Sequence, residues 1–251
     1  MAFLHEHIIL PLSDLLKGES VHKYLRRLRK AERWSTEQIY NFQQERLQLL
    51  LLHAAKHVPF YRDWFQLNGT DPLTVKLEQL PIVDKNLMRH EGIDRFSAQP
   101  SPNRIAARSS GSTGEPFSFF ITREAYSVNT AAKLHTWYQA GYRLGDRYMK
   151  IANGARHGRL KTLQDRINRC VYVPFYSMDD STLKEILERI ETTRPTIIRS
   201  YPVPLYLLAQ YRLEHPGFQH SPRHIMTTGS TLPLAYRNTI ERAFGCDVID
   251  S

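Results

Sequence analysis

The chain has 251 residues, of which 41% are hydrophobic and 24% charged, a composition ordinary for a globular protein with a sizeable core. No run approaches the roughly 20 apolar residues that a membrane helix needs, and the N-terminus lacks the basic lead-in of a secretory signal. The two cysteines, Cys170 and Cys246, lie far apart and outside any Cys/His cluster. These features argue against a disulfide framework and a zinc site, and they favour a cytoplasmic location.

The charge balance is basic, with 34 Lys and Arg against 25 Asp and Glu and a formal net charge of +9. Such a balance favours anionic partners such as ATP, coenzyme A or nucleic acid. Basic residues gather over residues 23–33 and 156–169, where a solvated helix face is the simpler interpretation. Neither stretch carries a recognised nucleic-acid-binding motif, so a nucleic-acid-associated protein is the weakest hypothesis.

The first hundred residues carry mainly helical patterns. Ser35 and Gln38 form a capping box, and apolar residues then recur at helical spacing until Pro59 ends the pattern. These apolar residues are Leu47, Leu50, Leu51, Ala54 and Val58. His53 and His57 lie at i and i+4 on the same helix without a carboxylate partner, so we expect packing or surface roles rather than a metal site.

From about residue 104, short apolar strands alternate with amphipathic helices, which indicates parallel α/β architecture. Strands are expected over residues 104–108, 117–121, 148–152, 171–173, 196–199, 224–228 and 247–249. Helices are expected from a Thr122 cap to about residue 140, over 204–212 and 234–244, and along the stripe Leu183, Ile186, Leu187 and Ile190. The predicted fold class is α/β: a mainly helical region over residues 1–100, then a mostly parallel sheet flanked by helices over residues 101–251.

The stretch SSGSTGEP, residues 109–116, places four hydroxyls and two glycines between two of the expected strands. Gly111 and Gly114 allow positive φ and a close approach of the backbone to a ligand, while backbone N–H groups and hydroxyls converge as donors. The stretch matches neither the G-x-x-x-x-G-K-[ST] nor the G-x-G-x-x-G pattern. From composition alone, a phosphate-binding loop and a polar surface turn are both open.

The order of residues in S-S-G-S-T-G-x-P resembles the phosphate-loop signature of the adenylate-forming superfamily, which includes acyl-coenzyme A synthetases, adenylation domains and luciferases. Five further segments resemble successive landmarks of its phenylacetate-coenzyme A ligase-like branch, which also contains homologues associated with capsular polysaccharide synthesis. They are HAAKHVPFYR (53–62), LPIVDKNL (80–87), GYRLGDR (141–147), SYPVPLYLLA (200–209) and TTGSTLP (227–233). The resemblance runs over nearly the whole chain, and the SSGSTGEP loop is its only specific motif.

The resemblance implies ATP-dependent activation of a carboxylic acid as an acyl-adenylate, with Mg²⁺, and transfer of the acyl group to coenzyme A or another acceptor. The phosphates would bind to Ser109, Ser110, Gly111, Ser112, Thr113 and Gly114. Gly229 and Ser230 would line the adenine side, Ser200 and Tyr201 would border the acid, and His157 would face the substrate. For the residues themselves, an ordinary strand-to-helix turn at 229–230 and a packing role for Tyr201 are the alternatives.

The sequence also departs from the family pattern. Phe117 stands where many members carry lysine, and Thr231 stands where relatives often have glutamate. In relatives, the segment that resembles residues 244–251 runs into a Tyr-Gly-x-Thr-Glu motif, whose glutamate binds Mg²⁺, and later into a mobile C-terminal domain. We therefore expect a fragment of a longer ligase, with a short noncatalytic module that binds nucleotide or a partner as the alternative. The last expected strand has no following helix, which leaves room for self-association through an uncovered sheet.

Overall fold

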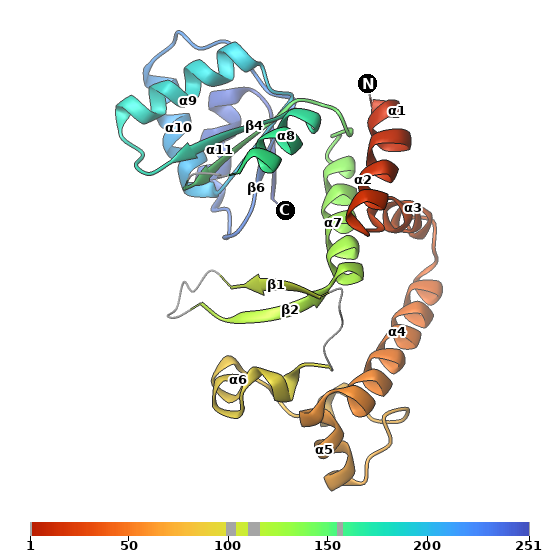
Figure 1. Cartoon of the computed structure of the whole chain (residues 1–251). Coiled ribbons are helices and arrows are strands. Elements are labelled where there is room, and N and C mark those ends of the chain that lie inside the picture. The colour runs from red at the N-terminus through yellow and green to blue at the C-terminus, as the bar shows by residue number, and fades with distance from the viewer. Residues whose placement is uncertain (1, 99–103, 110–115, 155–157, 251) are drawn as a thin grey trace. The chain divides into compact units, whose positions relative to one another are not determined.

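The computed structural model describes residues 2–98, 104–109, 116–154 and 158–250, and it divides into two compact units (Figure 1). One unit comprises Ser13–Ala132, and the other comprises Met1–Leu12 together with Lys133–Ser251. In the described part of the chain, no helix combines the length and the apolar character that crossing a membrane requires. The division into domains near residue 100 stays a prediction.

The unit Ser13–Ala132 is mainly helical, as its sequence patterns predict. Its elements are α3 (Val21–Ala31), α4 (Thr36–His57), α5 (Pro59–Asn68), η2 (Leu77–Gln79), α6 (Lys85–Glu91), η3 (Ile93–Phe96), β1 (Arg104–Arg108) and β2 (Ser118–Thr122). Two further helices, α2 (Leu10–Lys17) and α7 (Arg123–Gln139), contribute residues to both units.

Local signals in the sequence set the ends of α4. The Ser35 hydroxyl accepts a hydrogen bond from the Gln38 N–H at 3.2 Å, and the Gln38 side chain accepts one from the Ser35 N–H at 2.9 Å. This confirms the predicted capping box, which satisfies two N–H groups that the first turn leaves free. The helix ends at His57, and Pro59 begins α5, where a missing N–H costs nothing.

The apolar stripe of α4 is only partly buried. Leu51 packs with Phe65 and Val75 in a small core within this unit, whereas Leu50 is 62% exposed. Helical spacing therefore predicted the element correctly, but it did not distinguish the buried residues of the stripe from the exposed ones.

The unit that contains Lys133–Ser251 is built on a parallel sheet of the order β4-β3-β5-β6-β7, which confirms the predicted α/β class. Its strands are β3 (Tyr148–Asn153), β4 (Cys170–Phe175), β5 (Ile197–Ser200), β6 (His224–Thr227) and β7 (Asp247–Asp250). The connecting helices are α8 (Arg159–Ile167), α9 (Asp180–Thr193), α10 (Pro202–Glu214) and α11 (Leu234–Phe244). The short N-terminal elements α1 (Ala2–Leu4) and η1 (His5–Ile9) also belong to this unit.

One face of this sheet forms the main hydrophobic core. Helices α9, α10 and α11 supply its outer layer, and Figure 1 shows them in cyan to blue beside the labelled strands β4 and β6. The predicted stripe of α9 is buried in full, namely Leu183, Ile186, Leu187 and Ile190. Each such side chain stabilises the fold by about 1.5–3 kcal/mol on burial, so this face anchors the sheet.

Aromatic side chains pack against the opposite face. Tyr148 of β3 makes edge-on contacts with Trp137 and Tyr142, at ring-centroid distances of 5.4 and 5.9 Å. Trp137 lies in the last turns of α7, and Tyr142 is 2% exposed in the connection to β3. The C-terminal part of α7 is thereby fixed to the sheet.

Candidate functional site

The strand order creates a natural binding edge in the sheet. The chain passes from β3 outward to β4, returns to β5 on the other side of β3, and continues through β6 to β7. This is the 2-1-3-4-5 order of doubly wound folds, in which ligands bind outside the carboxyl ends of the strands, where the winding direction reverses. The reversal here lies between β3 and β5, so the residues that follow these strands are the first candidates.

Ser200 is the last residue of β5 and lies at this edge. Its side chain is buried, with 3% exposure, and its hydroxyl has no hydrogen-bond partner within the described residues. Its carbonyl accepts a hydrogen bond from the Thr228 N–H at 3.2 Å, which ties the end of β5 to the segment after β6. A buried hydroxyl without a partner costs free energy, which is a reason to consider Ser200 for a contact with a ligand.

Tyr201 and Gly229 lie against each other, although 28 positions separate them in the sequence. Tyr201 caps the N-terminus of α10, and Gly229 follows β6 with φ of +87°. A Cβ atom at position 229 would stand 2.6 Å from Tyr201 Cε1, so the ring occupies space that only glycine leaves open. The structure therefore brings together one residue predicted for the acid side and one predicted for the adenine side.

The remaining predicted residues lie in three different places. Ser230 is exposed in the segment between β6 and α11. Ser109 closes the β1–β2 hairpin: its N–H donates to the Phe117 carbonyl at 2.8 Å, and its hydroxyl accepts from the Phe117 N–H at 2.9 Å. His157 and the loop residues Ser110, Gly111, Ser112, Thr113 and Gly114 lie outside the described residues.

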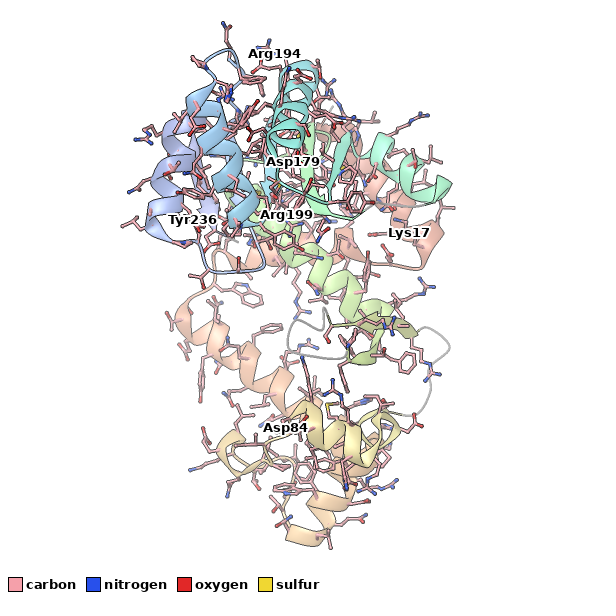
Figure 2. The ribbon with its side chains drawn as sticks, turned by 90° about the vertical axis from the view of Figure 1, so that its left-hand side faces the viewer. Lys17, Asp84, Asp179, Arg194, Arg199 and Tyr236 are labelled. Carbon is pink, nitrogen blue, oxygen red and sulfur yellow. The ribbon has the colours of Figure 1, made fainter. Side chains whose placement is uncertain are left out.

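Arg199 is a site residue that the sequence patterns did not single out. It lies one residue before the end of β5, and Figure 2 labels it. Its guanidinium donates a hydrogen bond to the Thr228 hydroxyl at 3.3 Å and lies 5.2 Å from the centre of the Trp137 ring. Burial lowers the pKa of this guanidinium. In the sequence, the only sign of Arg199 is a charged residue within the otherwise apolar strand segment TIIRS (196–200), which predicts a strand and no site.

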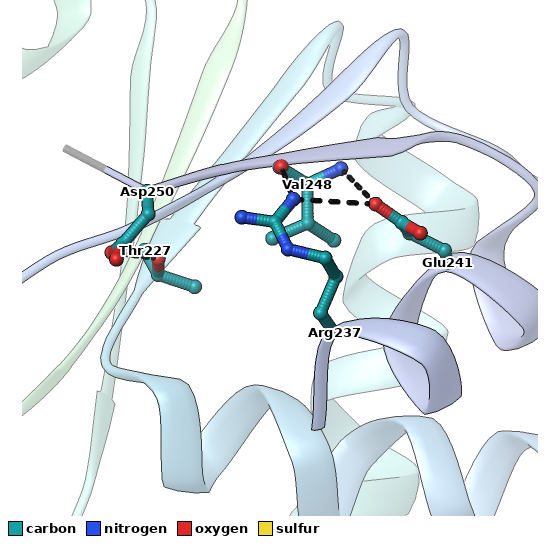
Figure 3. Close-up of polar contacts among 5 residues, drawn as sticks. All are labelled: Thr227, Arg237, Glu241, Val248 and Asp250. Carbon is teal, nitrogen blue, oxygen red and sulfur yellow. Dashed lines mark hydrogen bonds and ion pairs between the residues drawn. The ribbon is translucent and has the colours of Figure 1, made fainter. Parts of the chain in front are cut away.

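The edge strand β7 is held by hydrogen bonds to β6 at its carboxyl end and to α11 at Val248 (Figure 3). The Thr227 hydroxyl donates to the Asp250 carboxylate at 2.7 Å, which joins the carboxyl ends of β6 and β7. Arg237 and Glu241 of α11 bind the carbonyl and the N–H of Val248, respectively. The carboxylate at the end of β7 is therefore already hydrogen-bonded within the protein.

The described residues do not form a metal site made of protein side chains alone. Over the described ranges, no group of three His, Cys, Asp or Glu side chains is placed to hold a metal ion. His53 and His57 lie with their rings 4.9 Å apart on α4, and they belong to no such group.

The fold is similar to that of solved structures. No protein-family model and no curated protein matches the sequence. Among solved structures, 2-hydroxyisobutyryl-CoA ligase in complex with 2-HIB-AMP and CoA, in the thioesterification state, aligns with a TM-score of 0.65 and 22% identity. An open conformation of that ligase with the same two ligands aligns with a TM-score of 0.62 and 21% identity, and a postadenylation state with R3-HIB-AMP with 0.61 and 23%.

These alignments cover 86%, 82% and 82% of this chain, and 49%, 48% and 46% of the ligase chains. The chain therefore spans about half the length of the structures that it matches. It has the fold of the large N-terminal domain of these acid-CoA ligases.

Proposed function

We propose that this chain supplies the ATP- and acid-binding part of an adenylate-forming ligase. The reaction joins a carboxylic acid to the α-phosphorus of ATP, releases pyrophosphate, and passes the acyl group to coenzyme A or another acceptor. The sequence landmarks favour the phenylacetate-coenzyme A ligase-like branch, including its homologues in capsular polysaccharide synthesis. The substrate is a small carboxylic acid.

The main observation behind this proposal is the contact between Tyr201 and Gly229. The two residues come from separate landmarks, SYPVPLYLLA and TTGSTLP, and they lie in contact at the carboxyl edge of a doubly wound sheet. Ligands of such sheets bind at this edge. The fold shared with ligases that bind an acyl-AMP and CoA adds support, as does the SSGSTGEP loop.

Each set of candidate residues has a proposed role in the reaction. Backbone N–H groups and hydroxyls of residues 109–114 would bind the phosphates as charge develops on the leaving pyrophosphate. Gly229 and Ser230 would line the adenine, while Ser200, Tyr201 and His157 would border the acid. Fixed donors of this kind accelerate the reaction because they need no rearrangement as it proceeds.

Mg²⁺ would enter with the ATP phosphates. Ions of this kind are commonly held by one or two carboxylates together with substrate phosphates. Among the described residues, no group of three His, Cys, Asp or Glu side chains is placed to hold it.

Pyrophosphate exchange tests the proposed function. The complete gene product should exchange labelled pyrophosphate into ATP when a suitable acid is present. Gly111→Asp should abolish the exchange, because a carboxylate would fill the space near the phosphates and repel them. Gly217→Asp is the matched control, since nothing lies within 4 Å of a Cβ at that position. Absence of exchange across a broad panel of acids would contradict the proposal.

The second candidate function is a noncatalytic nucleotide-binding or partner-binding module. It is favoured by Phe117, which stands where many members of the superfamily carry a lysine, so that one cationic contact to the phosphates is missing. Calorimetry separates the two: ATP binding by the 251-residue chain without exchange supports the module, and absence of ATP and AMP binding rejects its nucleotide version.

A further inference from the structure

Two cationic side chains come from neighbouring elements on the face of the sheet that carries Trp137 and Tyr148, next to the candidate site. The guanidinium of Arg199 on β5 lies 5.2 Å from the centre of the Trp137 ring of α7. Lys133 lies one helical turn before Trp137, at i and i+4 on the same side of α7. Across the described ranges, neither cation forms an ion pair with a carboxylate, and Arg199 binds only the neutral Thr228 hydroxyl and the Trp137 ring. Within these ranges, the pair therefore carries two positive charges, and no carboxylate is paired with either of them.

The cost to the folded protein lies mainly at Arg199, because Lys133 is exposed. Partial burial lowers the pKa of Lys133, and the charge of Arg199 lowers it further. Arg199 Nε is buried and has no hydrogen-bond acceptor among the described residues. Buried charges are ordinarily paired, and groups with perturbed pKa values next to a binding edge are candidates for ligand contacts.

We propose that Lys133, Arg199 and the Thr228 hydroxyl bind a second carboxylate of the acid substrate, so that this protein acts on dicarboxylic acids. The inference rests on the proposed function, because it deepens the choice of acid. The Nη groups of Arg199 and the ammonium of Lys133 would donate to the carboxylate, with the hydroxyl as a neutral third group. An anion at this position would remove the repulsion between the two cations.

The position of the pair favours a carboxylate over a phosphate group. Arg199 directly precedes Ser200 and Tyr201, the two residues that border the acid in the proposed function. The phosphates are assigned to residues 109–114. A planar guanidinium also matches the two oxygens of a carboxylate, and the Trp137 ring offers an apolar wall for the carbon chain of the acid.

Matched acids test this subsite by direct binding. Glutarate and pentanoate have the same chain length and differ by one carboxylate, so both are titrated into the 251-residue chain, with inorganic phosphate as a third ligand. Glutarate should bind at least about 10-fold more tightly than pentanoate, as expected for a charge-assisted contact. Arg199→Met and Lys133→Met should each remove most of this difference.

Lys184→Met is the matched control. It removes one positive charge from α9, where Lys184 lies 3.8 Å from Glu188 on an exposed surface, and it should leave the preference for glutarate unchanged. Equal binding of glutarate and pentanoate, or a preference that survives Arg199→Met in a folded variant, would overturn the subsite. Phosphate that binds more tightly than glutarate and depends on Arg199 would overturn its assignment to a carboxylate. Failure of pyrophosphate exchange with every acid counts against the proposed function alone, because glutarate binding is measured without ATP.

Discussion

At the scale of single residues, the contact between Tyr201 and Gly229 has a simple steric origin. Gly229 combines a φ of +87° with a Tyr201 ring that fills the space of its missing Cβ. Both conditions exclude other residues at this position, because L side chains disfavour positive φ and a methyl group would overlap the ring. The glycine therefore determines where the tyrosine ring lies.

Gly229→Ala should destabilise the protein by about 1–3 kcal/mol and displace the Tyr201 ring. Denaturant unfolding measures the loss of stability. Because the loss arises from overlap with the Tyr201 ring, Gly229→Ala should cost less when Tyr201→Ala has already removed the ring. Gly217→Ala, with open space around its Cβ position, should change stability by only a few tenths of a kcal/mol. Equal losses in the single and double variants would contradict the steric explanation.

The sequence could predict only some of the site residues. Ser200 and Tyr201 stand where a strand ends and a helix begins, a junction that local patterns predict, and their assignment to the acid is implied by the resemblance of SYPVPLYLLA to the ligase branch. Arg199 was not singled out, because its contacts are with Trp137 and Thr228, which come from other parts of the chain. The contact between Tyr201 and Gly229 was equally invisible, since no local pattern indicates which loops meet.

At the scale of elements, local signals predicted the helices and strands well, with small shifts at their ends. Helix α11 has the predicted bounds, whereas α10 begins at Pro202 rather than at residue 204, because proline at the first helical position is compatible with the helix. Strand β2 begins at Ser118, one residue later than predicted. There, Ser109 and Phe117 bind each other as the closing pair of the hairpin.

The edge strand β7 is protected by α11. The Val248 carbonyl and N–H would otherwise be free to pair with another strand, and Arg237 and Glu241 bind them (Figure 3). Unpaired edge groups are a common route to association between chains. The expected self-association through this end of the sheet stays a prediction, and these two side chains oppose it at Val248.

Arg237→Ala and Glu241→Ala should each reduce stability by about 1 kcal/mol and speed hydrogen exchange of the Val248 amide, more strongly for Glu241→Ala. Both should increase self-association at high protein concentration, as measured by light scattering. Glu188→Ala breaks an exposed ion pair of the same i,i+4 spacing on α9 and should change neither quantity measurably. Unchanged exchange at Val248 in Glu241→Ala would show that the side chain does not protect the edge.

At the scale of the whole molecule, the net charge of +9 predicts a general affinity for polyanions without sequence preference. Binding of this kind releases counterions and weakens steeply with salt. Heparin and DNA of unrelated sequences should therefore bind comparably at 50 mM salt and lose affinity in parallel towards 200 mM, as measured by fluorescence anisotropy. A single DNA sequence that stays bound at the higher salt concentration would support the nucleic-acid hypothesis instead.

The sequence by itself determined the α/β class and the order and approximate ends of the elements. These follow from short-range physics: side-chain periodicity, helix caps, and the conformations of glycine and proline. The candidate residues at the strand ends are implied by the resemblance to the adenylate-forming superfamily. Only the tertiary structure decided the strand order, the contact between Tyr201 and Gly229, and the position of Arg199 beside Trp137. Those features depend on packing between residues distant in the chain, which local patterns do not encode.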